Sequence, residues 1–117
     1  MRKYMRLRRK HDLDFRLRGY LRNRIYYALK LGRGTKSAST LELLGCTIEE
    51  LRLRLERQFA PGMSWDNYGR GQGKWSVDHI KSCASFDLTG PMQQRECFNY
   101  RNLQPLWDPD NIKKGCK

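Results

Sequence analysis

Two short apolar segments in the C-terminal half, residues 75–80 and 103–107, constrain the fold most strongly. In the first segment, Trp75 and Val77 alternate with polar residues, which is typical of a half-buried β-strand. A glycine-rich turn at residues 69–73 precedes this segment. We expect the second segment to form a strand that pairs antiparallel with the first. Two paired strands set among helical segments predict an α+β fold.

Helical spacing dominates the part of the chain before these strands. Apolar residues recur at three- and four-residue steps between Asp12 and Leu31, which predicts an amphipathic helix over those residues. The preceding run, Met1 to Lys10, is basic, and we expect it to be poorly ordered on its own. The apolar stripe of the helix consists of Leu13, Leu17, Tyr20 or Leu21, Ile25, and Ala28 or Leu29.

Capping signals predict shorter helices further along the chain. Residues 47–50 have the pattern of a capping box, so a helix should begin there and end at Pro61-Gly62. Pro91 suits the first position of a helix that runs to about Asn99. Asp108 is expected to be the N-cap of a final helix with Pro109 in its first position.

The 117 residues suit one compact domain with a modest core. Within it we distinguish three parts. Residues 1–36 form a basic arm and an amphipathic helix, residues 37–73 form helical support and a connector, and residues 74–117 contain both strands.

The whole chain has a formal charge of +12, and most of this positive charge lies in the N-terminal third. Residues 1–36 contain 13 of the 24 Lys and Arg residues but only 2 of the 12 acidic residues. Such a basic block favours binding to a polyanion such as nucleic acid, because each phosphate that it neutralises releases counterions. A solvated tail is the alternative, and membrane binding is less favoured because apolar anchors are lacking. Candidate phosphate contacts on the helix are Arg16, Arg22 and Arg24.

The four cysteines are scattered, and none belongs to a C-x-x-C pair. We therefore expect no structural zinc, and we expect reduced, mostly buried thiols. The cysteines are Cys46, Cys83, Cys97 and Cys116.

No apolar run approaches the roughly 20 residues of a membrane span. A cytoplasmic protein is the resulting expectation, in the host cytoplasm if a phage encodes it.

Asp78 and His79, at the end of the first strand, are the candidate chemical groups. Phosphodiester hydrolysis needs a base to activate water, which an imidazole can supply. It also needs a hard divalent ion to absorb developing charge, and such ions prefer oxygen ligands such as those of Asp78 and Asn111. Neighbouring side chains point to opposite faces of a regular strand, so the backbone must bend here or the two groups must act from different sides. A locally capped aspartate beside a core histidine is the structural alternative.

These residues resemble the HNH endonuclease family, especially compact phage-type members. The resembling segments are Trp75 to Ile80, Ser85 to Leu88, Cys97 to Trp107 and Asp110 to Gly115, with weaker similarity at Leu43 to Cys46 and Phe59 to Trp65. The resemblance implies a ββα-metal nuclease core over residues 74–117, with the basic N-terminal helices packed on it. It further implies cleavage of double-stranded DNA with one Mg²⁺ or Mn²⁺ ion, leaving 5′-phosphate and 3′-hydroxyl ends.

The resemblance also assigns a role to each matching residue. His79 matches the general base, and Asp78 matches the acidic metal ligand before it. Asn102 matches the asparagine that steadies the histidine-bearing loop. Asn111, nine residues later, matches the final position of the motif, a second metal ligand.

Two features depart from the family pattern. The paired C-x-x-C zinc ligands of many members are absent, so Trp65, Trp75, Phe86 and Trp107 are expected to brace the fold instead. Lys81-Ser82 stands where relatives have an apolar residue and proline, and Lys81 becomes a candidate phosphate contact together with Lys113 and Lys114. A non-catalytic DNA-binding module and an RNA-binding accessory protein are the alternatives. Phage packaging or recombination proteins are candidate partners.

Overall fold

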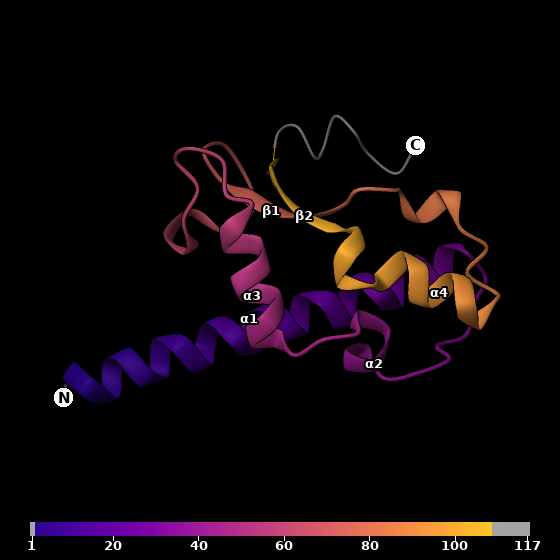
Figure 1. Ribbon diagram of the computed structural model, residues 1–117, viewed down its shortest axis with the longest axis horizontal. Coiled ribbons are helices and arrows are strands. Elements are labelled where there is room, and N and C mark those ends of the chain that lie inside the picture. The colour runs from indigo at the N-terminus through magenta and orange to yellow at the C-terminus, as the bar shows by residue number, and fades with distance from the viewer. Residues whose placement is uncertain (1, 109–117) are drawn as a thin grey trace.

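The chain folds as an α+β structure in which helices pack around one antiparallel pair of strands (Figure 1). A computed structural model describes residues 2–108, with side chains from residue 13 onward. The predicted fold class is therefore confirmed at this level. The helices are α1 (Arg2–Leu31), α2 (Thr40–Leu44), α3 (Ile48–Arg57) and α4 (Pro91–Phe98), and the strands are β1 (Trp75–His79) and β2 (Leu103–Trp107). Single 3₁₀ turns are η1 (Trp65–Asn67), η2 (Cys83–Ser85) and η3 (Tyr100–Asn102).

Helix α1 is the longest element, and it starts well before the predicted position. It begins at Arg2 rather than at Asp12, so the predicted start of the helix was wrong. The physical reason is local, because arginine, lysine, leucine and methionine are good helix formers and no glycine or proline interrupts the run. The predicted apolar stripe is confirmed by burial of Leu17, Leu21, Ile25 and Leu29.

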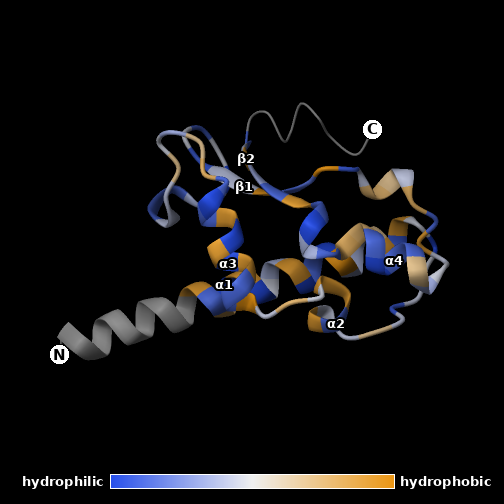
Figure 2. Cartoon of the chain, viewed as in Figure 1, coloured by the Kyte–Doolittle hydropathy of each residue, from blue (hydrophilic) through white to orange (hydrophobic). Residues whose placement is uncertain are grey.

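Two apolar clusters line the same face of α1. The first joins α1 to α3 and the strands, and Trp75 lies at its centre, fully buried among Phe59, Trp65 and Tyr68. The second joins the C-terminal half of α1 to α2, α4 and the loop before α4. Figure 2 shows apolar residues where α1 and α3 meet. Of the expected braces, Trp65 and Trp107 pack against the first cluster and Phe86 against the second. The second cluster consists of Ile25, Leu29, Leu43, Leu88, Cys97 and Phe98.

The short helices begin where the capping signals predicted. In α3 the Thr47 hydroxyl accepts from the Glu50 backbone N–H while the Glu50 carboxylate accepts from the Thr47 N–H, which confirms the capping box. Helix α4 begins at Pro91, as expected. Helix α3, however, ends at Arg57 with Gln58 as its C-cap, before the predicted stop at Pro61-Gly62. The ring of Phe59 still packs on Trp75, so tertiary contact and not helix periodicity explains its apolar character.

The two strands pair in the predicted antiparallel sense. Their register places His79 opposite Leu103, Asp78 opposite Gln104, and Trp75 opposite Trp107. Helix α1 is fastened to the sheet by the Tyr20 hydroxyl, which donates to the Val77 carbonyl oxygen at 3.0 Å. Tyr20 thereby ties the basic helix directly to the strand that ends in Asp78 and His79.

Asp108 closes the described part of the chain immediately after β2. Its carboxylate accepts from the backbone N–H of Gly71 at 2.8 Å and from the Ser76 hydroxyl at 3.4 Å. The glycine-rich turn is thus held against the start of the sheet. The predicted final helix, together with the ββα arrangement that depends on it, lies outside the described residues. Across residues 2–108, no helix is both long enough and apolar enough to cross a membrane.

The two leucines Leu55 and Leu53 of α3 allow a matched test of this packing. Leu55 is fully buried in the first cluster, whereas Leu53 is 42% exposed on the same helix. We expect Leu55→Ala to lower the free energy of unfolding by roughly 2–5 kcal/mol, because a buried cavity is left behind. Leu53→Ala should change it by less than about 1 kcal/mol, since surface positions tolerate substitution. Urea denaturation followed by circular dichroism measures both, and equal effects would contradict the described packing.

Candidate active site

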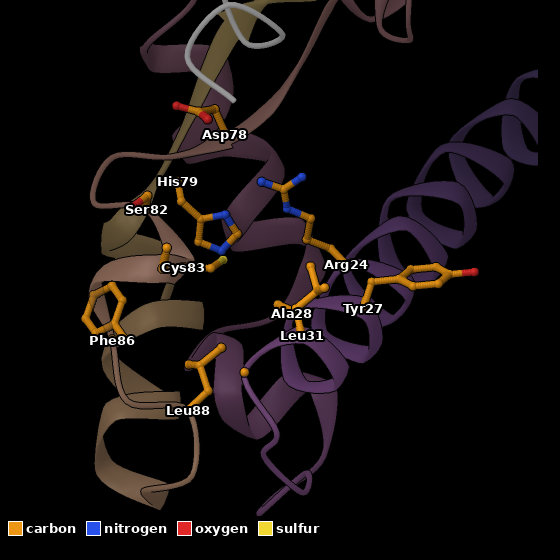
Figure 3. Close-up of a pocket in the computed structure, with 12 residues that line it drawn as sticks. Arg24, Tyr27, Ala28, Leu31, Asp78, His79, Ser82, Cys83, Phe86 and Leu88 are labelled. Atoms are coloured by element: carbon orange, nitrogen blue, oxygen red, sulfur yellow. The ribbon is translucent and has the colours of Figure 1, made fainter. Parts of the chain in front are cut away.

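A cavity of about 390 Å³ opens between α1 and the segment that follows β1 (Figure 3). The end of β1 contributes Asp78 and His79 to its wall, and the basic helix contributes Arg24. The remaining lining is mainly apolar or small, including Ala28, Leu31, Ser82, Cys83, Phe86 and Leu88. Both predicted chemical groups therefore border the same hollow as a positively charged side chain from the N-terminal third.

Asp78 and His79 point in different directions at the end of β1. In Figure 3 the imidazole of His79 points toward Cys83, while the carboxylate of Asp78 points away from that cysteine. Both residues are buried, with exposed fractions of 3% and 4%. The Asp78 carboxylate accepts from the side-chain N–H of Gln104, its partner across the sheet, at 3.1 Å. The strand therefore keeps its regular alternation, and the two side chains point away from each other (Figure 3).

Asn102 fastens the segment that leaves β1. Its Oδ1 accepts from the Lys81 backbone N–H at 2.8 Å, and its Nδ2 donates to the Lys81 carbonyl oxygen at 3.0 Å. The same Nδ2 donates to the carbonyl oxygen of Cys97 at 2.9 Å, and the Asn102 backbone oxygen accepts from the Ile80 N–H at 2.8 Å. One side chain thus links the start of β2, the end of α4 and the chain directly after His79. These bonds hold the chain after β1 against the end of α4.

The predicted DNA contacts divide into a group on α1 and a group near the strand. Arg22 is exposed, Arg16 lies over the ring of Tyr68 at 5.7 Å from its centroid, and Arg24 is half-buried at the cavity. Lys81 is exposed, with Nζ 4.7 Å from the centroid of the Phe86 ring. Arg16 and Arg22 are both exposed on α1, whereas Arg24 is not. The other predicted site residues, Asn111, Lys113 and Lys114, lie outside the described residues.

A cluster that was not predicted lies beside the cavity. His79, Cys83 and Cys97 bring one imidazole nitrogen and two Sγ atoms within 4.8 Å of one another. Among the described residues this is the one group of three such side chains that could hold a metal ion. Cys83 comes from η2 and Cys97 from the buried face of α4. No C-x-x-C pattern marks it, although the H-x-x-x-C spacing of His79 and Cys83 was a usable signal.

Hydrogen bonding polarises the two thiols of this cluster. A hydrogen bond with Cys97, aided by one with His79 and by the His79 and Arg24 charges, lowers the pKa of the Cys83 thiol despite its burial. The same thiol–thiol bond, with burial, raises the pKa of Cys97. The direction of both shifts favours a thiolate at Cys83 over one at Cys97. Among the described residues, Cys46, Cys83 and Cys97 are free thiols, and of these Cys97 alone is buried.

Comparison with known proteins finds two viral relatives. The chain is 40% identical to the uncharacterized protein L426 and 41% identical to the uncharacterized protein L246, both of Acanthamoeba polyphaga mimivirus. Each match covers 106 residues, which is 91% of this chain and 44% of the relative. The chain thus spans less than half the length of these relatives. No family model matches the chain. No solved structure matches it either.

The Asn102 bonds predict a specific change in backbone protection. In Asn102→Ala the Lys81 amide loses its acceptor, whereas the Ile80 amide keeps the backbone oxygen of residue 102. We expect hydrogen exchange at Lys81 to accelerate roughly two- to tenfold, because one hydrogen bond contributes about 0.5–1.5 kcal/mol net. Exchange at Ile80 should change less.

Asn67→Ala is the matched control for this measurement by NMR. Asn67 also bonds the backbone on two sides, at Ser64 and Gly62, but it lies in η1 away from the cavity. Its substitution should leave Lys81 exchange unchanged. Equal protection of Lys81 in the Asn102→Ala variant and the wild-type protein would remove Asn102 as the clamp of this segment.

Proposed function

We propose that this chain is a metal-dependent DNA endonuclease of the HNH type, in which His79 is the general base. The observation that carries the proposal is that Asp78 and His79 line one cavity together with Arg24 of the basic helix. A hard-oxygen donor, a base and a cation are the three kinds of group that phosphodiester hydrolysis requires. The bonds from Asn102 to Lys81 support it, because they hold the backbone directly after the base.

His79 accepts a proton from water in the proposed reaction. The resulting hydroxide forms a bond to phosphorus while the bond between phosphorus and the 3′ oxygen breaks. The departing 3′ oxygen takes a proton from solvent, so the products are a 5′-phosphate and a 3′-hydroxyl. The apolar lining contributed by Ala28, Leu31 and Leu88 limits water around the imidazole, which strengthens the electrostatic interactions made there.

The carboxylate of Asp78 fits a hard divalent ion, because Mg²⁺ and Mn²⁺ prefer oxygen ligands. Asp78 would hold the ion together with Asn111, which lies outside the described residues. When bound, such an ion neutralises charge that develops on the phosphate and the departing oxygen. The hydrogen bond from Gln104 orients the Asp78 carboxylate for this purpose. Because Asp78 and His79 diverge, the scissile phosphate would lie across the end of β1, with the base on one side and the ligand on the other.

Helix α1 supports double-stranded DNA as the partner. It contributes Arg24 to the cavity and presents Arg22 to solvent. The arginines that attract phosphate would then lie next to the proposed catalytic residues. Tyr20 ties the same helix to β1. A module that binds DNA without cutting it is the alternative function. It predicts the same salt-dependent binding with no cleavage under any divalent ion.

Cleavage of supercoiled plasmid tests the base directly. We expect the wild-type protein to nick plasmid with Mg²⁺ or Mn²⁺, and EDTA to abolish the reaction. His79→Ala should reduce the rate by about 10²- to 10⁴-fold, the usual contribution of general base catalysis. The control is His11→Ala, which changes the chain's other histidine and should nick at the wild-type rate. Wild-type nicking by His79→Ala would remove the base assignment, and no nicking by any form would favour the non-catalytic alternative.

The salt dependence of DNA binding tests the role of α1. If Arg22 contacts one phosphate, Arg22→Gln should reduce the slope of log affinity against log salt by roughly 0.9. Arg57→Gln is the control, because Arg57 is exposed at the end of α3 and is not among the predicted contacts. Fluorescence anisotropy with a short duplex measures both slopes. Equal slopes for Arg22→Gln and wild type would exclude Arg22, and tighter binding to duplex RNA than to DNA would favour an RNA partner.

A further inference from the structure

We propose that His79, Cys83 and Cys97 bind one thiophilic metal ion of the Zn²⁺ class. We further propose that the bound ion prevents His79 from acting as a general base. The geometric basis is the convergence of three ligand atoms from β1, η2 and α4 within 4.8 Å of one another. The second half of the proposal rests on the nuclease function proposed above. The first half, metal binding, stands on the cluster alone.

The spacing of the three atoms is close to that of a tetrahedral site. Zinc binds sulfur at about 2.3 Å and imidazole nitrogen at about 2.0–2.1 Å, which places tetrahedral ligand atoms roughly 3.4–3.8 Å apart. The upper limit of 4.8 Å in this structure means that each pair must close by no more than about 1.0–1.4 Å. Rotation of the half-buried Cys83 side chain can shorten its distances to the other two ligand atoms.

The surroundings leave room for a fourth ligand. His79 and Cys83 line the 390 Å³ cavity, whereas Cys97 is fully buried behind them. Three protein ligands with one open position facing a cavity is the arrangement in which water completes the coordination of zinc. The ion would therefore enter from the cavity, and its fourth ligand would remain exchangeable.

Charge balance also suits a divalent ion at this position. Two thiolates and a neutral imidazole carry a charge of about −2, which one divalent ion cancels, so the buried group as a whole becomes neutral. The hydrogen bond from Cys97 already favours the thiolate form of Cys83, and the nearby guanidinium of Arg24 favours both thiolates. Binding of the ion would release the proton of Cys97, because both sulfurs coordinate as thiolates.

Ligand softness separates this site from the proposed hydrolytic one. Two sulfurs and one nitrogen favour Zn²⁺, Cd²⁺ or Cu⁺, whereas the carboxylate of Asp78 favours Mg²⁺ or Mn²⁺. The Asp78 carboxylate points away from Cys83, so the two kinds of donor lie on different sides of β1 (Figure 3). His79 lies beside the two sulfur ligands, and in the proposed hydrolysis it is also the general base. An ion bound to its imidazole nitrogen would compete with the proton that this nitrogen must accept.

Cobalt titration of the fully reduced protein tests the binding half. We expect one equivalent of Co²⁺ to produce thiolate-to-cobalt charge-transfer absorption and the visible bands of tetrahedral Co²⁺, and Zn²⁺ to bleach both. Loss of a residue that only supports a metal ligand weakens metal binding roughly 10- to 100-fold. Cys83→Ser removes a ligand itself, so it should weaken binding by at least about 100-fold. Cys97→Ser should do the same, with circular dichroism confirming that each variant is folded.

Cys46→Ser is the matched control for the titration. Cys46 is a half-buried thiol outside the cluster, and burial raises its pKa to about 11. This variant should give the wild-type spectrum. Absence of charge transfer in the wild-type protein, or an undiminished spectrum in Cys83→Ser, would overturn the metal site. If the protein kept under reducing conditions had a mass two hydrogens below that of the fully reduced chain and bound no cobalt, the metal site would also be overturned. That result would indicate a Cys83–Cys97 disulfide.

The nicking assay tests the inhibitory half separately. For each protein the rate with Mg²⁺ is compared with and without one equivalent of Zn²⁺, so each variant serves as its own reference. We expect Zn²⁺ to slow wild type and Cys46→Ser by more than tenfold, in the range of general base loss, and to have less than a twofold effect on Cys83→Ser. Equal inhibition of all three would overturn the inhibitory role. A full cobalt spectrum with no nicking under Mg²⁺ or Mn²⁺ would reject the nuclease and the inhibition while retaining the metal site.

Discussion

The antiparallel pairing of β1 with β2 is the interaction on which the candidate site depends. Each strand has only five residues, so few hydrogen bonds join them. The pair is held from one side by the aromatic cluster around Trp75 and at its far end by Asn102, whose side chain bonds the backbone of Lys81 and Cys97. Tyr20 adds a bond from the basic helix to Val77. A sheet of only two short strands is unstable alone in water, and here packing against α1 and α3 stabilises it.

Strand alternation makes the side chains of Asp78 and His79 point to different sides of β1. Asp78 faces its cross-strand partner Gln104, and His79 faces the cavity, Cys83 and Arg24. In the function that we propose, the carboxylate serves a hard ion and the imidazole serves as base. The thiols beside the imidazole introduce a second chemistry, because they favour soft ions. One histidine would then connect hydrolysis with control by metal.

Local patterns predicted much of this fold, because strand alternation, capping and proline position act over a few residues. The capping box at Thr47, the helix start at Pro91 and the antiparallel strands all follow from such patterns. The early start of α1 at Arg2 was missed because charge suggested disorder where helix propensity prevailed. The approach of Cys97 to Cys83 was missed for a different reason. It depends on how α4 packs against the end of β1, which no spacing in the sequence records.

The chemistry of the cut ends tests the proposed hydrolysis most directly. Wild-type protein is incubated with supercoiled plasmid and Mg²⁺, and the nicked circles are purified and treated with DNA ligase alone. Hydrolysis that releases the 3′ oxygen leaves a 5′-phosphate beside a 3′-hydroxyl, so ligase should reseal the nicks without kinase or phosphatase. Nicks that require removal of a 3′-phosphate before ligation, or a plasmid that stays intact with both Mg²⁺ and Mn²⁺, would contradict the proposed function.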